Sequence, residues 1–180
     1  MKRFLLPFIG LCALVVATPL LAAKPAPVDS EWEEVAYGLQ FMREEEKLAR
    51  DVYLYYDAIY GKQTKTFSNI AVSEQRHTDA VAGLLDKYGV DDPAEKTKPG
   101  EFTIAELQAL YNTLVSIGTD LRSALEVGVT IEEKDMTDIR EWIEVSVDYP
   151  DIVQVYSHLL AGSASHLDAF LKALATLGEE

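Results

Sequence analysis

Cysteine is nearly absent from this chain: Cys12 is the single one among 180 residues. It lies in an N-terminal segment that we expect to be removed, so the remaining chain forms no disulfide. Its stability must then come from a hydrophobic core or from a metal. The lack of thiolates also disfavours copper(I) and iron–sulfur centres.

Basic residues are also scarce, with 16 Lys and Arg against 30 Asp and Glu and a net charge of −14. Phosphates repel such an acidic chain, which argues against nucleic acid and anionic membrane surfaces as partners. The charge suits the attraction of cations, although a solvated acidic surface is the commoner explanation. Long apolar runs are missing beyond the N-terminus. No stretch of alternating apolar and polar residues is long enough to predict a β-sheet.

The N-terminus has the pattern of a secretory signal peptide. It begins with basic residues, continues with the apolar run Phe4 to Val16, and then has small residues that offer cleavage points. We expect residues 1–23 to be removed, residues 24–30 to form a linker, and residues 31–180 to fold as one domain. The chain is then periplasmic or secreted, with no stable membrane insertion after cleavage. An uncleaved membrane anchor is the alternative.

Apolar residues beyond the linker recur every three or four positions, which is the pattern of amphipathic helices. The pattern predicts four long helices, with one short helix between the second and the third. The expected ranges are 30–61, 67–89, 119–146 and 150–178 for the long helices and 103–118 for the short one. Two helix pairs joined by a long crossover predict an all-α, ferritin-like four-helix bundle whose crossover carries a short helix.

Local signals at the helix ends support these ranges. Two capping boxes are predicted, Ser30 with Glu33 in the first helix and Thr103 with Glu106 in the short helix. Gly89 is expected to end the second helix, because glycine readily adopts the left-handed conformation found after helix ends.

Each long helix places polar residues in its apolar stripe: Glu46, then Glu74 with His77, then Glu132, and then His166. Residues three apart lie about 60° apart on one helix face, so Glu74 and His77 point the same way. A bundle that binds two metal ions takes one Glu from each of two helices and Glu-x-x-His from each of the other two. Three carboxylates in one dry core repel one another unless protons or cations neutralise them. The pattern therefore predicts a metal centre at these five residues.

The fourth helix departs from this pattern because Ser163, rather than Glu, precedes His166 by three positions. Asp135, on the third helix, could supply the missing oxygen; otherwise one metal position is weak or only one ion binds. Glu45 and Glu133 adjoin the predicted ligands and are weaker candidates, since one residue is about 100° of rotation. Any of these residues alone would more often belong to the core or to the surface.

Other polar residues near the stripes have weaker patterns. Tyr53 and Tyr56 could act in electron transfer, although tyrosines on a helix stripe usually belong to the core. Arg50 and Arg76 could pair with ligand carboxylates or simply be exposed. His158 fits a partly exposed polar residue better than a ligand.

The first helix contains Glu46-x-x-Ala49-Arg50-x-x-Tyr53, which is similar to the pattern on the first helix of rubrerythrin-type ferritin-like proteins. Further segments resemble the bacterial ferritin-like family called domain of unknown function 2202: 42–53, 67–71, 73–77, 124–128, 131–133, 160–163, 166–167 and 169–170. The resemblance covers nearly all of residues 35–175. It implies a ferritin-like bundle with a candidate di-iron centre, and it implies no particular activity.

We expect iron, as one or two ions, with manganese or zinc as alternatives, because carboxylates and imidazoles suit these metals. Fold analogy then favours redox activity toward oxygen or peroxide, either ferroxidase-like or peroxide-reducing. No Cys-x-x-Cys segment of the rubredoxin kind is present, so the electrons would come from another molecule. The alternative is a non-catalytic metal-binding bundle, or a structural or interaction bundle of the cell envelope. The sequence is compatible with a homo-oligomer.

Overall fold

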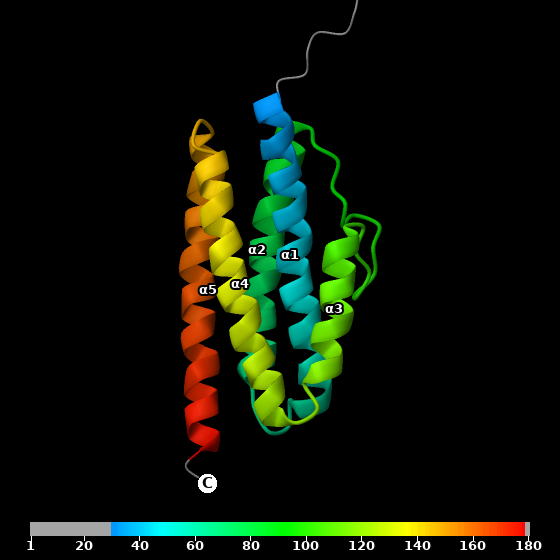
Figure 1. Cartoon of the computed structure of the whole chain (residues 1–180), viewed down its shortest axis with the longest axis vertical. Coiled ribbons are helices and arrows are strands. Elements are labelled where there is room, and N and C mark those ends of the chain that lie inside the picture. Colours follow the sequence, from blue (N-terminus) through cyan, green and yellow to red (C-terminus); the bar gives the residue numbers. More distant parts are fainter. Residues whose placement is uncertain (1–29, 179–180) are drawn as a thin grey trace, which may run out of the picture.

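The computed structural model describes residues 30–178, which contain five helices and no strand. The helices are α1 (Ser30–Tyr60), α2 (Thr66–Tyr88), α3 (Ala105–Ile117), α4 (Leu121–Val145) and α5 (Pro150–Leu177). Figure 1 shows the four long helices running side by side, with the shorter α3 outside them next to α1. The all-α, ferritin-like bundle with a short crossover helix is thus confirmed. The predicted signal peptide and nearly all of the linker lie outside the described residues.

The helices form two hairpins, α1 with α2 and α4 with α5, which meet through contacts of α1 with α4 and of α2 with α5. Large aromatic side chains fill the space between the hairpins. Tyr53, Phe67 and Phe170 are fully buried, and the rings of Tyr53 and Phe170 lie 5.1 Å apart. Burying one such side chain contributes about 1.5–3 kcal/mol to folding, so this cluster holds the two hairpins together.

The helix ends follow local chemistry in two places. Gly89 adopts the left-handed conformation after α2, with φ 67°, and its N–H bonds back to Asp86, as the sequence predicted. Asp120 caps α4: its side chain accepts from the Ser123 N–H at 2.8 Å, while the Ser123 hydroxyl accepts from the Asp120 N–H at 3.0 Å. This reciprocal pair fixes where the crossover ends and α4 begins.

The predicted capping box of Thr103 with Glu106 is wrong. The residue before α3 is Ile104, and no side chain in its own segment caps the helix. Instead the buried carboxylate of Glu44, on α1, accepts from the N–H groups of Thr103 at 2.7 Å and Ile104 at 2.8 Å. A carboxylate at a helix start satisfies free N–H groups and favours the helix dipole, whichever segment supplies it.

A buried ion pair also fastens the crossover to α1. The Lys47 ammonium lies 2.8 Å from Asp51 Oδ2 and donates to the carbonyls of Lys98 and Glu101. Asp51 Oδ2 also accepts from the Gly100 N–H at 2.9 Å. Because every partner here is a protein group, the segment before α3 is held firmly along α1.

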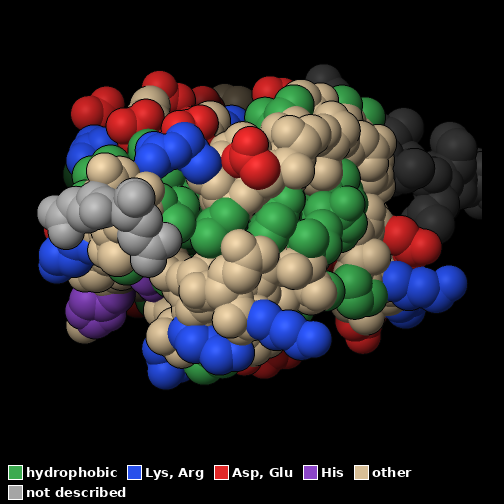
Figure 2. Space-filling model, turned by 90° about the horizontal axis from the view of Figure 1, so that it is seen from below, with side chains coloured by type: hydrophobic (Ala, Val, Ile, Leu, Met, Phe, Trp, Pro, Cys, Tyr) green, Lys and Arg blue, Asp and Glu red, His purple; other side chains and the backbone are tan. Residues whose placement is uncertain are grey.

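The end of the bundle where α5 stops exposes apolar side chains. Figure 2 shows them in the middle of this face, with charged side chains around the rim. A groove of about 420 Å³ near this end is lined mainly by residues of α4 and α5, among them Leu121, Leu125, Ala173 and Leu177. Within residues 30–178, no helix is long and apolar enough to cross a membrane.

Candidate metal centre

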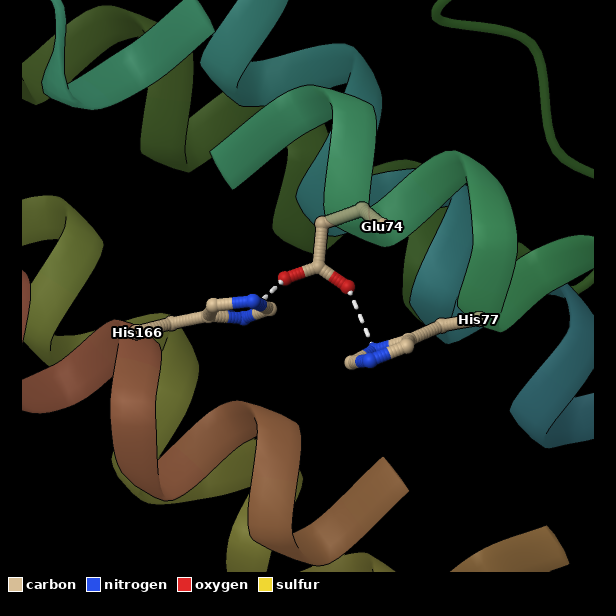
Figure 3. A group of neighbouring side chains, drawn as sticks. All are labelled: Glu74, His77 and His166. Carbon is tan, nitrogen blue, oxygen red and sulfur yellow. Dashed lines mark ion pairs between the residues drawn. The ribbon is translucent and has the colours of Figure 1, made fainter. Parts of the chain in front are cut away.

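Three side chains from two helices converge in the interior of the bundle. Glu74 and His77 come from α2 and His166 from α5, and Figure 3 shows the carboxylate between the two imidazoles. Glu74 Oε1 lies 2.7 Å from His166 Nδ1, and Glu74 Oε2 lies 3.0 Å from His77 Nδ1. One donor atom from each of the three residues lies within 4.8 Å of the others, which is an arrangement that could hold a metal ion.

The other two long helices each add a carboxylate to this group. Glu46 Oε2, on α1, lies 3.1 Å from His77 Nδ1, and Glu132 Oε2, on α4, lies 3.5 Å from His166 Nδ1. Both Glu side chains are 1% exposed. The structure therefore brings all five of the sequence-predicted residues into one connected set of contacts.

Several polar atoms here are buried without a hydrogen-bond partner: Glu46 Oε1, Asp135 Oδ1 and His166 Nδ1. The 2.7 Å approach of Glu74 to His166 Nδ1 lies off the direction of a ring N–H bond, so it is a close polar contact and not a directed hydrogen bond. Leaving a buried polar atom unpaired costs about 1–3 kcal/mol. The donors are carboxylate oxygens and imidazole nitrogens, which fit iron, manganese or zinc.

The carboxylates of α1 and α4 resist ionisation in this setting. Burial raises the pKa of Glu46 well above its ordinary value and outweighs the opposing contact with His77. Burial also raises the pKa of Asp135, and the charges of Glu46, Glu74 and Glu132 raise it further. The pKa of Glu132 rises to about 7, chiefly through burial. Charge is thus costly here unless a cation balances it.

The histidines and Glu74 shift in the opposite sense, toward their charged forms. Burial lowers the pKa of His77, but Glu46 and Glu74 raise it more, to about 11. Contacts with Glu132 and Glu74 likewise overcome burial and raise the pKa of His166 to about 9. Burial raises the pKa of Glu74, yet both histidines lower it more, to about 2. Without an ion, protons on the histidines therefore neutralise the group, and a metal has to displace them.

Ser163 occupies the position where the two-metal pattern has Glu, and it turns toward α4. Its Oγ lies 2.5 Å from Asp135 Oδ2, and both side chains are buried. This contact fixes the Asp135 carboxylate beside the other acidic groups. Asp135 thus lies next to the position where α5 has Ser163 in place of Glu.

Of the two weaker candidates, Glu133 does not join the group, and Glu45 makes no ion pair with its histidines, although Glu45 Oε2 is buried without a hydrogen-bond partner. Glu45 is buried but pairs with Lys134 on α4, its Oε1 lying 2.6 Å from the ammonium, and Glu133 is exposed. Arg50 bonds Asp51 and Gln75 rather than a ligand carboxylate.

The two tyrosines singled out in the sequence have different surroundings. The Tyr53 hydroxyl donates to Glu132 Oε1 at 2.6 Å, so it orients a carboxylate of the group. The Tyr56 hydroxyl donates to the carbonyl of Leu114 and accepts from the N–H of Gly118. Tyr56 therefore fastens the crossover.

Sequence reasoning missed Tyr156 on α5. Its side chain is fully buried, and its hydroxyl has no hydrogen-bond partner. Burial raises its pKa, with a smaller contribution from the charge of Glu46. Tyr156 precedes Ser163 by seven positions and Leu159 by three, so the helical period would have placed it on the inner face.

Comparison with known proteins identifies the family. Residues 35–180 match the model of an uncharacterized protein domain, DUF2202. The chain belongs to the DUF2202 family. The uncharacterized protein MJ0754 of Methanocaldococcus jannaschii is 45% identical over 148 residues, which span 81% of this chain and 78% of that protein. The crystal structure of the hypothetical protein MJ0754 matches with a TM-score of 0.75 and 43% identity over 87% of each chain. The family match confirms the resemblance seen in the sequence, and the names of the family and of MJ0754 give no activity.

Proposed function

We propose that this DUF2202 protein binds one or two iron-type ions and uses them in redox chemistry with oxygen or peroxide. One observation carries the metal part: Glu74, His77 and His166 bring their donor atoms within 4.8 Å of one another in the interior. The unpaired oxygens of Glu46 and Asp135 beside them support it. A buried acidic group of this kind is stable when a cation balances it.

The residues divide naturally between two ions. Glu74, His77 and His166 would hold the first, and Glu46 and Asp135 offer their unpaired oxygens to a second. Glu132 faces His166, and Tyr53 holds its other oxygen in place. The four carboxylates, when ionised, match the charge of two divalent ions.

The redox part rests on the resemblance to rubrerythrin-type proteins and on the donor set. Iron held by carboxylates and imidazoles supplies one-electron exchange between its +2 and +3 states. The side chains of His77 and His166 are 12% and 8% exposed, against 1–2% for Glu46, Glu74 and Glu132. A small oxidant would therefore approach the group from the side of the histidines. The side of the carboxylates is closed to water because these side chains are buried.

Metal binding is tested on the full chain purified without chelator. Anaerobic titration with iron(II) should show uptake of one or two ions per chain, and the double change Glu74→Ala, His77→Ala should abolish it. Glu133→Ala, which removes an exposed carboxylate next to Glu132, is the matched control and should bind like the wild type. No uptake by the wild type would refute the metal centre; equal uptake by the double variant would place it elsewhere.

Catalysis needs a separate measurement, because a non-catalytic metal-binding bundle has support of its own. The groove of about 420 Å³ is lined by none of Glu74, His77 and His166, so it is not a substrate site for this group. Consumption of oxygen or peroxide by the iron-loaded protein, above that of the double variant, supports the redox proposal. A loaded protein that consumes neither is a metal-binding protein without this activity.

We also propose that the protein is exported, because residues 1–23 have the pattern of a signal peptide. Mass spectrometry of the chain recovered from the producing cells tests this. A mature N-terminus near residue 24 supports export, and an intact Met1 in the cytoplasm contradicts it.

A further inference from the structure

Gly162 lies within α5, in a helix interior where alanine would be the more favourable residue. It faces His77 across the contact between α5 and α2. A Cβ added at Gly162 would lie 2.5 Å from both Cε1 and Nε2 of His77, far closer than two such atoms can approach. We propose that Gly162 is a positioning residue of the metal centre, whose missing side chain lets His77 present Nδ1 to the ion. This inference rests on the proposed metal binding.

The His77 ring is confined on several sides. Its Nδ1 lies 3.1 Å from Glu46 Oε2 and 3.0 Å from Glu74 Oε2, while the Cε1–Nε2 edge faces the backbone of Gly162. Its plane stacks on His166, with ring centroids 5.3 Å apart and an angle of 28°. A methyl group at Gly162 would therefore push the ring at its Cε1–Nε2 edge, which adjoins the Nδ1 atom that contacts the carboxylates.

The expected response to that methyl group is a movement of the side chain, and not a failure to fold. The atoms in its way are the far end of His77, which can rotate about its own side-chain bonds, and no backbone atom is equally close. Rotation relieves the overlap but carries Nδ1 away from Glu46 and Glu74. The glycine thus matters for the ligand more than for the packing of α2 and α5.

Other helical glycines show that this situation is specific. A Cβ at Gly83 on α2 would meet nothing within 4 Å, so Gly83 has no neighbour to accommodate. Gly128 on α4 faces the ring of Phe170, a core side chain, at 2.5 Å. Among these three, Gly162 alone faces a candidate ligand, and Gly83 provides a matched control for a glycine-to-alanine change.

Cobalt(II), used as a spectroscopic probe in place of iron(II), tests the proposal by titration of the full chain. Gly162→Ala should weaken cobalt binding at least about tenfold, the scale seen when support for a ligand is lost, whereas Gly83→Ala should bind like the wild type. The cobalt spectrum of Gly162→Ala should match that of His77→Ala, because both lose the same nitrogen. Binding and spectrum unchanged in Gly162→Ala would overturn the proposal.

A second measurement, without metal, separates this inference from the proposed function. The unfolding free energies of wild type, Gly162→Ala, His77→Ala and the double variant form a cycle. Alanine at position 162 should stabilise the chain more when His77 is absent, because the overlap is gone. Equal effects in both backgrounds would refute the contact. A wild type that binds no cobalt would refute the metal centre together with this role, whereas binding retained in Gly162→Ala would refute only the role of Gly162.

Discussion

Two buried acidic regions each include residues from the segment Glu44 to Asp51 of α1. Their carboxylates are satisfied in opposite ways. In the crossover clamp, formed by Glu44, Lys47 and Asp51, protein donors reach the carboxylates: both oxygens of Glu44 accept backbone N–H groups, and Asp51 pairs with Lys47. In the candidate metal centre, Glu46 leaves Oε1 unpaired, as Asp135 leaves Oδ1. Burial of a carboxylate alone therefore does not identify a ligand; Glu46 differs because its unpaired oxygen belongs to a side chain that contacts His77.

Three consecutive glutamates make the contrast sharpest. Glu44 caps α3, Glu45 pairs with Lys134, and Glu46 contacts His77, yet all three are buried. Each step along the helix turns the side chain by about 100°, so neighbours in sequence face different helices. Glu44 has a structural role, Glu45 forms an ion pair with α4, and Glu46 contacts the candidate metal centre.

The largest expected effect comes from breaking the clamp. Lys47→Ala leaves Asp51 buried without its ammonium partner, so we expect the free energy of unfolding to fall by about 3–5 kcal/mol. Chemical denaturation measures this, and metal uptake by the folded fraction should be unchanged. A loss below about 1 kcal/mol would mean that the Gly100 N–H and the Arg50 guanidinium are enough to satisfy the charge of Asp51.

The next effect comes from filling the metal centre. An ion present at a hundred times its dissociation constant should raise the free energy of unfolding by about 2.7 kcal/mol, because it binds the folded chain. The gain should persist in Glu133→Ala and vanish in Glu74→Ala, His77→Ala. Thermal unfolding with and without the ion measures it; an equal gain in the double variant would show binding outside the centre.

A graded effect is expected from pH in the ion-free protein. The pKa values of His77 and His166 are raised to about 11 and about 9, above the ordinary 6.5. Protonation of these groups therefore stabilises the fold fully below pH 6.5, and this stabilisation is lost as the pH rises through 9 and 11. Each group contributes at most about 1.4 kcal/mol per pH unit.

Glu74 acts in the opposite direction. Its pKa is lowered from 4.5 to about 2, so its stabilisation is present above pH 4.5 and is lost as the pH falls to 2. Urea unfolding across this range should show the ion-free chain losing stability on both the acid and the alkaline side. His77→Ala should flatten the alkaline limb; a wild-type profile that is already flat there would contradict the contacts of His77.

The smallest effect should follow Tyr53→Phe. This change removes the hydroxyl that donates to the buried Glu132 Oε1 and should cost about 1–3 kcal/mol in unfolding free energy. Metal affinity should fall as well, because Glu132 loses the group that orients it. Tyr37→Phe, at a residue that is 47% exposed, is the control and should change neither quantity.

The sequence predicted the helices well because their apolar residues recur with the helical period and because Gly89 marks an end locally. It failed at the start of α3, where the cap is Glu44, some sixty positions earlier in the chain. Periodicity also led to Glu74, His77 and His166, which the structure groups together. It placed Glu46 in the apolar stripe but could not show that Glu44 caps α3 or that Glu45 pairs with Lys134. Gly162 has no side chain, so no sequence pattern points to it.

The candidate ligands are shared equally between the two hairpins: α1 and α2 supply Glu46, Glu74 and His77, and α4 and α5 supply Glu132, Asp135 and His166. An ion bound among them is a cross-link that must open before the hairpins separate. Its donor atoms converge only after the hairpins have docked, so it would slow unfolding while leaving the folding rate nearly unchanged. The lifetime of the folded protein, more than its rate of formation, would then depend on the metal supply.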